Sequence, residues 1–136
     1  MADQWQKAIA SFRKRVDTLP VEVAKETGRL AAQELVDRTP QLTGHLVYNW
    51  RVRFSPSAVE RKGTDLGGQV VLAEMLAAIE KIDRARVFYL VNPTDYGPHV
   101  EYGTERMEGR LFVAAAQAKL KRLATQAIKN VQARQK

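Results

Sequence analysis

The N-terminal part of the chain has the hydrophobic spacing of a long amphipathic helix. Its large apolar residues recur with heptad spacing in two interleaved series: Trp5, Phe12 and Leu19, and Ile9, Val16, Val23 and Leu30. These positions share one face of a helix, and the opposite face is charged. Such a stripe belongs either to an ordinary core or to a contact with a neighbouring subunit.

Pro20 interrupts this helical pattern. Proline lacks an amide hydrogen and crowds the preceding turn, so we expect a kink or a break near Leu19, with a second helix beginning at Pro20. The apolar series keeps its phase across the proline, which favours the kink. The helical region is expected over 3–38 and should end before Pro40.

Period-two alternation begins after this helix. Apolar side chains occupy every second position and alternate with mostly polar ones: Leu46, Tyr48, Trp50, Val52 and Phe54. This alternation predicts a half-buried strand over 46–54. A buried strand is expected over 86–92, where β-branched and aromatic residues precede an Asn-Pro pair, and a further short strand over 99–102.

Helical spacing returns in two later segments. Residues 69–82 predict a helix, and the alternative is a short strand over 69–72 followed by a helix. The Ala-rich segment 109–131 predicts a second long amphipathic helix. Residues 58–68 are rich in charge and glycine, and we expect a mobile hairpin or loop there.

The order of these elements predicts an α+β fold, with long N-terminal and C-terminal helices packed on a small, mainly antiparallel β-sheet. A chain of 136 residues with 45% hydrophobic content has the size for one core, so we expect a single domain over 1–136. Its parts are an N-terminal helical region 3–38, a sheet region with an inserted loop and helix 45–104, and a C-terminal helix 109–131.

Composition argues against several chemistries. The chain has no cysteine, which excludes disulfides, thiolate nucleophiles and Cys-containing zinc sites. No H-E-x-x-H, Walker A, G-x-G-x-x-G or G-x-S-x-G motif occurs, so His45 and His99 are expected to have surface or hydrogen-bonded structural roles. We therefore expect no catalytic, cofactor or metal site. The absence of a long apolar run and of a signal-peptide h-region predicts no membrane association and expression in the cytoplasm.

The net charge of +7 is concentrated at one end of the chain. All acidic residues precede Arg110, whereas seven basic residues follow from that position onward. The candidates for contact with DNA phosphates or an acidic partner are Lys119, Lys121, Arg122 and Lys129. The alternative is that these cations suit the dipole of a helix C-terminus and are otherwise solvated.

Three further side chains are candidates for contacts. Glu101, expected in the short strand, could face a partner cation, and Arg51 and Arg53 are the candidates if the strands are neighbours. The alternative for Glu101 is an exposed strand position. Tyr96 and Tyr102 either pack on the core or contact another subunit.

Two short signatures lie about fifty residues apart. The first is Thr39-Pro40-Gln41-Leu42-Thr43-Gly44-His45-Leu46, leading to Trp50. The second is Asn92-Pro93-Thr94-Asp95-Tyr96-Gly97, running on to Glu101-Tyr102-Gly103-Thr104. Proline fixes φ, glycine allows positive φ, and Thr or Asn can bond the neighbouring backbone, so each signature has the chemistry of a chain reversal.

Together these signatures resemble the tail-completion and neck (head–tail joining) proteins of tailed bacteriophages, the family that includes minor tail protein Z of lambda-like phages. In that family a Thr-Pro-x-x-Thr-Gly-x-Leu stretch follows an N-terminal helix, and an Asn, a Tyr before a small residue, and Glu-x-Gly-Thr come later. The matching positions here are Thr39, Pro40, Thr43, Gly44, Leu46, Asn92, Tyr96, Gly97, Glu101, Gly103 and Thr104. Leu42 and His45 replace an Asp and an Arg that are common in the family.

The resemblance implies a non-enzymatic virion component that assembles as a ring at the junction of tail and head, with six-fold symmetry expected from the tail tube. The implied partners are copies of itself, a tail-terminator or tail-tube protein, and a head-completion or connector protein, with DNA contact in the channel as a further expectation. The implied location is the tail or neck of the virion, and the host cytoplasm during assembly. The alternative function is a basic nucleic-acid-binding protein that uses the C-terminal helix.

Overall fold

One long helix organises the molecule. The computed structural model describes residues 2–84 and 86–135, and for residues 2–18 and 107 it describes the backbone alone. Helix α1 runs from Ala2 to Arg38 and contains Pro20. The expected second helix beginning at Pro20 is therefore wrong, since a single proline removes only one hydrogen bond of this long ladder. The helix ends before Pro40, as predicted, and the amide of Thr39 still donates to the carbonyl of Leu35 at 3.0 Å.

The alternating segment after α1 folds differently from the prediction. Residues His45–Tyr48 form a short helix, α2, and only Arg51–Arg53 form a strand, β1. Leu46, Val47 and Trp50 are all buried. These three buried residues are one and then three positions apart, a spacing that places them on one face of a helical turn. The segment therefore folds as a helix, because Val47 must be buried as well, which the alternation of a strand does not allow.

The strand expected over 86–92 and the helix expected over 69–82 are both present, and both are shorter than predicted. Strand β2, Tyr89–Val91, pairs antiparallel with β1 and confirms the strand expected over 86–92. Helix α3, Gln69–Glu80, confirms the helix expected over 69–82, so the alternative strand over 69–72 is wrong. No strand forms between β1 and α3 in the described chain, so this segment is a loop and not a hairpin.

The segment expected as a strand over 99–102 is a helix. Helix α4, Gly97–Tyr102, has Pro98 near its start, where the missing amide hydrogen costs no helical bond. Gly103 ends α4 with φ of 87° and leads into a hairpin of two short strands, β3 (Gly103–Thr104) and β4 (Met107–Glu108). Position 103 requires glycine, because residues with an L side chain rarely adopt this φ.

The C-terminal helix expected over 109–131 is present with an interruption. Helix α5 covers Phe112–Ala118, helix α6 covers Leu120–Arg134, and Lys119 separates them. The α+β class is thus confirmed, with long terminal helices and a small antiparallel sheet. None of the described helices has the length and apolar character to span a membrane.

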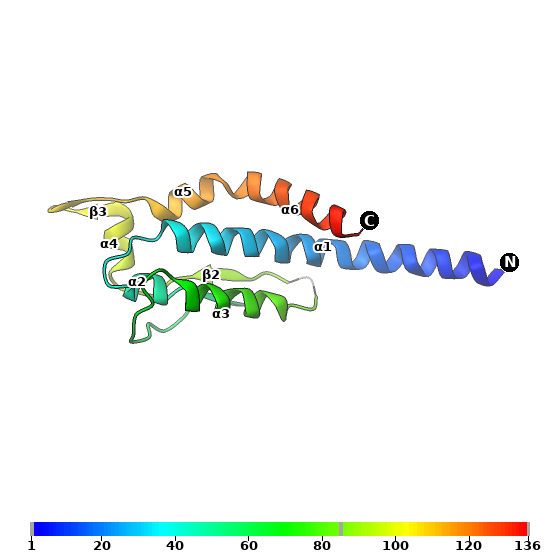
Figure 1. Cartoon of the computed structure of the whole chain (residues 1–136), viewed down its shortest axis with the longest axis horizontal. Helices are drawn as coiled ribbons and strands as arrows, with labels where there is room; N and C mark the ends of the chain where they lie inside the picture. Colours follow the sequence, from blue (N-terminus) through cyan, green and yellow to red (C-terminus); the bar gives the residue numbers. More distant parts are fainter. Residues whose placement is uncertain (1, 85, 136) are drawn as a thin grey trace.

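Helix α1 lies between two layers (Figure 1). Helices α5 and α6 run along one side of it, and α3 with the β1–β2 pair lies on the other. At one end of the molecule α4 and the β3–β4 hairpin connect these layers; at the opposite end the N-terminal part of α1 extends beyond the end of α6. The buried core joins residues of both layers: Ala32, Leu35, Val36, Leu46, Val47, Trp50, Val71, Met75, Ile79, Val100, Phe112 and Ala116.

Candidate functional site

The two sequence signatures meet at the end of the molecule that carries α2 and α4. The side-chain amide of Asn92 donates to the carbonyl of Leu46 at 2.8 Å. A Cβ placed on Gly97 would lie 3.6 Å from Cδ1 of Leu46, so the second signature packs closely on the first. We call this region, formed by residues 39–50 and 92–102, the signature end.

Buried hydrogen bonds fix the first signature to the end of α1. Trp50 donates its indole N–H to the hydroxyl of Thr39 at 2.8 Å, and that hydroxyl donates to the carbonyl of Leu35. Thr39 and Trp50 are both buried. Pro40 is half-buried beside them, so these signature residues fasten the end of α1 to β1.

Gly44 allows the backbone of residues 65–66 to pack closely against the first signature. Its φ is 87°, and a Cβ there would lie 2.6 Å from the backbone nitrogen of Leu66. The amide of Asp65 also donates to the carbonyl of Gly44 at 3.0 Å. Both conformation and space therefore require glycine at this position. Thr43 is exposed, and its hydroxyl accepts from the amide of His45 at 3.3 Å.

The second signature is a hydrogen-bonded turn. The amide and hydroxyl of Thr94 donate to the side-chain oxygen of Asn92, at 3.3 Å and 2.9 Å. The amide of Gly97 in turn donates to the hydroxyl of Thr94 at 3.1 Å. Thr94 is buried, so this network fixes the start of α4.

Glu101 has a different role from the predicted one. It is buried on α4, and its two carboxylate oxygens accept hydrogen bonds from the amides of Val113 and Ala114, at 2.8 Å and 3.0 Å. These amides are in the first turn of α5, where they have no partner within the helix. Glu101 therefore caps α5 from a neighbouring helix, and the suggested pairing with Arg51 or Arg53 is wrong.

The two arginines lie elsewhere. Arg51 and Arg53 line a hollow of about 390 Å³ together with Arg61 and Glu74. Arg51 also donates to the carbonyl of Val59 at 2.7 Å. Gly103 and Thr104 likewise lie outside the meeting point of the signatures, in the β3–β4 hairpin, where the Thr104 hydroxyl accepts from the amide of Arg106.

Two hollows flank the start of α4. The first, of about 250 Å³, has apolar and polar walls made by both signatures: Leu42, Thr43, His45, Leu46, Thr94 and Tyr96. The second, of about 260 Å³, is also lined by both: Trp50, Leu90, Asn92, Gly97, Pro98, Glu101, Tyr102, Phe112 and Val113. Both hollows are small, and residues of both signatures contribute to their walls.

Large apolar side chains are exposed around these hollows. They are 45–78% exposed and belong to the signatures or to residues in contact with them: Leu42, Leu66, Tyr96, Tyr102 and Leu111. Leu111 has φ of 47° and is the only non-glycine residue with positive φ among those described. Tyr96 and Tyr102 are thus not core residues of the isolated chain, and the subunit-contact alternative stays open for them.

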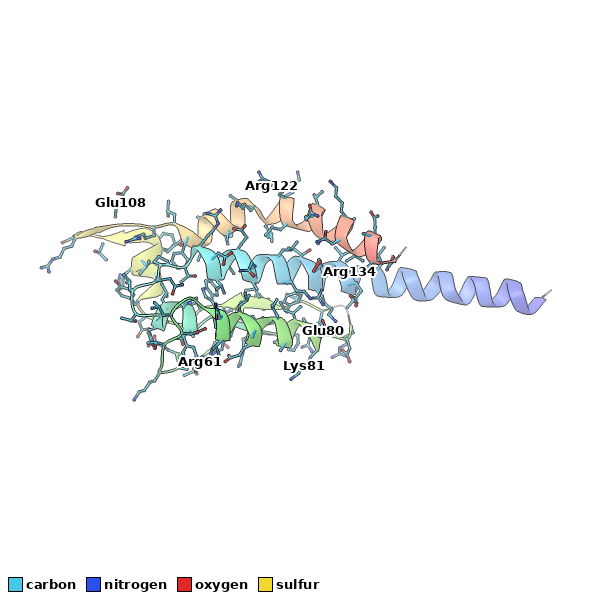
Figure 2. All side chains as sticks on the ribbon, in the orientation of Figure 1. Arg61, Glu80, Lys81, Glu108, Arg122 and Arg134 are labelled. Carbon is cyan, nitrogen blue, oxygen red and sulfur yellow. The ribbon has the colours of Figure 1, made fainter. Side chains whose placement is uncertain are left out.

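The sequence did not single out a cluster that ties the loop before α3 to α2. Asn49 is buried; its side-chain oxygen accepts from the amide of Arg61 at 2.8 Å, and its side-chain nitrogen donates to the carbonyl of His45 at 3.0 Å. Arg61 donates twice to the carbonyl of Tyr48, stacks on the Tyr48 ring at 3.9 Å, and pairs with Glu74 at 2.9 Å. Arg61 belongs to this loop, and Figure 2 labels it below the start of α3. The sequence signal for this cluster is Asn49, a polar residue among the apolar residues around it.

His45 belongs to the same cluster. Its ring nitrogens lie 2.8 Å from the carbonyl of Gly63 and 3.2 Å from the carboxylate of Glu60. The bond to the Gly63 carbonyl, and then that to Glu60, raise the pKa of His45. This is the hydrogen-bonded structural role expected of it, whereas His99 is exposed. Among the described side chains, no three His, Cys, Asp or Glu residues are grouped so that they could hold a metal ion.

Of the basic residues predicted to contact DNA or an acidic partner, some are already paired with acidic side chains of the same chain. Lys119 pairs with Glu34 of α1 at 3.4 Å, so its charge is used within the fold. Lys121, Arg122 and Lys129 are exposed, and Arg122 points away from α1 (Figure 2). Arg134 pairs with the buried Glu26 at 2.6 Å.

Glu26 is the centre of the contact between α1 and α6. Burial would raise the pKa of Glu26, but hydrogen bonds from Asn130 and Arg134 and the charges of Arg134 and Arg29 outweigh that effect and hold the pKa below its ordinary value. The carboxylate therefore stays ionised and joins α6 to α1.

No family model, curated protein or solved structure matches this chain.

Proposed function

We propose that this chain is a structural virion protein of a tailed phage or prophage, which completes the tail and joins it to the head through assembly as an oligomeric ring. The single observation that supports the proposal is the signature end, where the two signatures that resemble those of tail-completion and neck proteins are joined by hydrogen bonds and flanked by exposed apolar side chains.

The chemistry of the signature end favours binding by shape. The polar groups of Thr39, Asn92, Thr94 and Glu101 are engaged in hydrogen bonds inside the molecule. Large apolar side chains stay exposed for a partner: Leu42, Leu66, Tyr96, Tyr102 and Leu111. Tyr is favoured at interfaces because it combines a large apolar ring with a polar tip, and a small protomer gains stability by covering such surface in an assembly.

The proposed partners follow from the resemblance. The signature end would meet neighbouring virion proteins, a tail-terminator or tail-tube protein and a head-completion or connector protein, while copies of the chain form the ring. The protein would act in the tail or neck of the virion after assembly in the host cytoplasm, and it would work by forming interfaces and not by catalysis.

A second candidate, a nucleic-acid-binding protein, keeps support from one observation. Lys121, Arg122 and Lys129 are exposed on α6 and have no acidic neighbour within ion-pair distance among the described side chains. Engagement of Lys119 and Arg134 in ion pairs weakens this candidate, because phosphate contacts need free cations. Within a neck ring the same surface would face DNA in the channel or an acidic partner.

The test replaces apolar residues at the signature end in the phage or prophage that encodes the chain. Leu42→Ser combined with Tyr102→Ser should reduce the yield of joined, infectious particles while the purified variant stays folded, since loss of a large side chain from an interface costs about 1–2 kcal/mol. Val87→Ser is the matched control, because the exposure of Val87, 69%, lies between those of Leu42, 57%, and Tyr102, 78%, and Val87 is outside the signature end. Full infectivity of the double variant would contradict the proposal.

A further inference from the structure

A hollow beside β1 is lined by three arginines. Its volume is about 390 Å³, and its lining comes from β1, the residue before β1, the loop that follows, and α3: Trp50, Arg51, Val52, Arg53, Arg61, Glu74, Met75 and Ala78. Half of these residues are apolar and half are charged. We call this site the arginine hollow.

The positive charge of Arg61 is already compensated within the hollow. Arg61 pairs with Glu74 at 2.9 Å, and its guanidinium also donates twice to the carbonyl of Tyr48, at 3.0 Å and 2.8 Å. Arg61 and Glu74 therefore form a part of the wall with no net charge. The positive charge of the hollow comes from the other two arginines.

Arg51 and Arg53 have no acidic partner. In the described part of the chain, no carboxylate lies within ion-pair distance of either. Arg51 is half-buried, and its hydrogen bond to the carbonyl of Val59, at 2.7 Å, supplies no negative charge. Its Nε is the one buried side-chain nitrogen or oxygen among the described residues that has no hydrogen-bond partner. A partly buried cation without a counter-ion costs free energy, so the hollow favours an anionic ligand.

Strand β1 places the two unpaired arginines within reach of one ligand. Residues two positions apart in a strand lie on the same face, about 6.6 Å from each other. A guanidinium group is planar, and its paired N–H groups match the two oxygens of a carboxylate. Arg53 is exposed, so the ligand has access from solvent on the side of this residue.

We propose that the arginine hollow binds a carboxylate group carried on a hydrocarbon stem, as in a glutamate side chain or a small dicarboxylic acid. Arg51 and Arg53 hold the carboxylate, and the apolar half of the lining contacts the stem. A phosphate group has no such stem, and its charge of about −1.5 to −2 would be repelled more strongly by Glu74. This inference goes beyond the proposed function, because the hollow shares only Trp50 with the signature end.

The test is an NMR titration of the full-length protein at constant ionic strength, since salt screens an exposed ion pair. It follows the backbone amides of β1 and the arginine Nε–Hε signals. The probes are glutarate, a hexaglutamate peptide and inorganic phosphate. Glutarate and the peptide should give saturable shifts at Arg51 and Arg53, and phosphate should bind more weakly than glutarate.

Two variants should change glutarate affinity in opposite directions. Arg53→Gln should weaken binding about fivefold, because it removes one of the two cations. Its control is Arg84→Gln, which removes an exposed arginine that does not line the hollow and should bind as the wild type does. Glu74→Gln should strengthen binding, because it removes the repelling carboxylate and frees Arg61. A misfolded variant could not show this gain.

The control for that gain is Glu22→Gln, since the side chains of Glu22 and Glu74 are similarly exposed, at 44% and 48%. It should leave the affinity unchanged.

The comparison of the two carboxylate probes identifies the source of the ligand. Tighter binding of the peptide than of glutarate would assign the site to an acidic segment of a partner protein, and equal affinity would assign it to a free organic acid. Shifts that do not saturate, an equal loss in Arg53→Gln and Arg84→Gln, or tighter binding of phosphate would each overturn the proposal. The infectivity test at Leu42 and Tyr102 leaves the arginines unchanged, so its failure is distinguishable from a failure here.

Discussion

At the scale of single residues, the polar members of the signatures act on neighbouring backbone segments. Thr39 receives the indole of Trp50, Asn92 reaches the carbonyl of Leu46, and Glu101 accepts two amides of α5. Each of these hydrogen bonds joins two different segments of the chain. Substitution of one of these residues should therefore loosen the packing of both segments.

Glu101→Gln should destabilise the fold by about 1–3 kcal/mol, because a glutamine offers one acceptor oxygen to two buried amide donors and leaves one of them unsatisfied. The measurement is the free energy of unfolding in denaturant. Glu105→Gln, at an exposed position of the β3–β4 hairpin, is the control and should have little effect. Equal stability of both variants would show that Glu101 does not cap α5.

His45 gives the fold a pH dependence of known sign. Its pKa in the folded chain is raised by the Gly63 carbonyl and by Glu60, so its contribution is complete below the unfolded pKa of about 6.5 and is lost as pH rises through the folded pKa. Between pH 6 and pH 8 the wild type should lose more stability than His45→Gln, measured by urea unfolding. Identical pH profiles would contradict this role.

At the scale of elements, periodicity identified the long helices because each has one continuous apolar face over several turns. This held for 3–38, 69–82 and 109–131. It failed for α2 and α4, where a few residues are positioned by Gly44, Pro98 and Gly103 and by contacts distant in sequence. The cap from Glu101 and the Asn49–Arg61 cluster were not predictable, since both depend on which segments meet in space.

The contact between α1 and α6 depends on Glu26. Glu26→Gln should destabilise the protein by about 1–2 kcal/mol at neutral pH, because Arg134 and Arg29 lose a charged acceptor. The folded pKa of Glu26 is lowered, so this contribution exists above its unfolded pKa, near 4.5, and is lost as pH falls through the folded pKa. The deficit of the variant, measured by thermal unfolding, should therefore shrink in acid.

A control for the charge change is Glu22→Gln, since Glu22 is more exposed and lies 4.0 Å from Lys25. It should leave stability nearly unchanged. A deficit of Glu26→Gln that does not shrink as pH falls below 4.5 would mean that packing and not the ionised carboxylate holds α6.

At the scale of the whole molecule, the signature end and the N-terminal part of α1 lie at opposite ends (Figure 1). The signature end presents exposed apolar side chains on a hydrogen-bonded frame. Covering these side chains in an assembly would add to the stability of a small core, which is what the proposed ring requires.

The most direct test of the proposed ring is the mass of the purified protein in solution, by light scattering across concentration and salt, with a duplex-DNA titration on the same sample. The account predicts a ring-sized oligomer that resists salt, because its contacts are apolar, and that binds duplex DNA weakly. A monomer or dimer that binds DNA tightly, with affinity falling steeply as salt rises, would contradict it and favour the nucleic-acid-binding alternative.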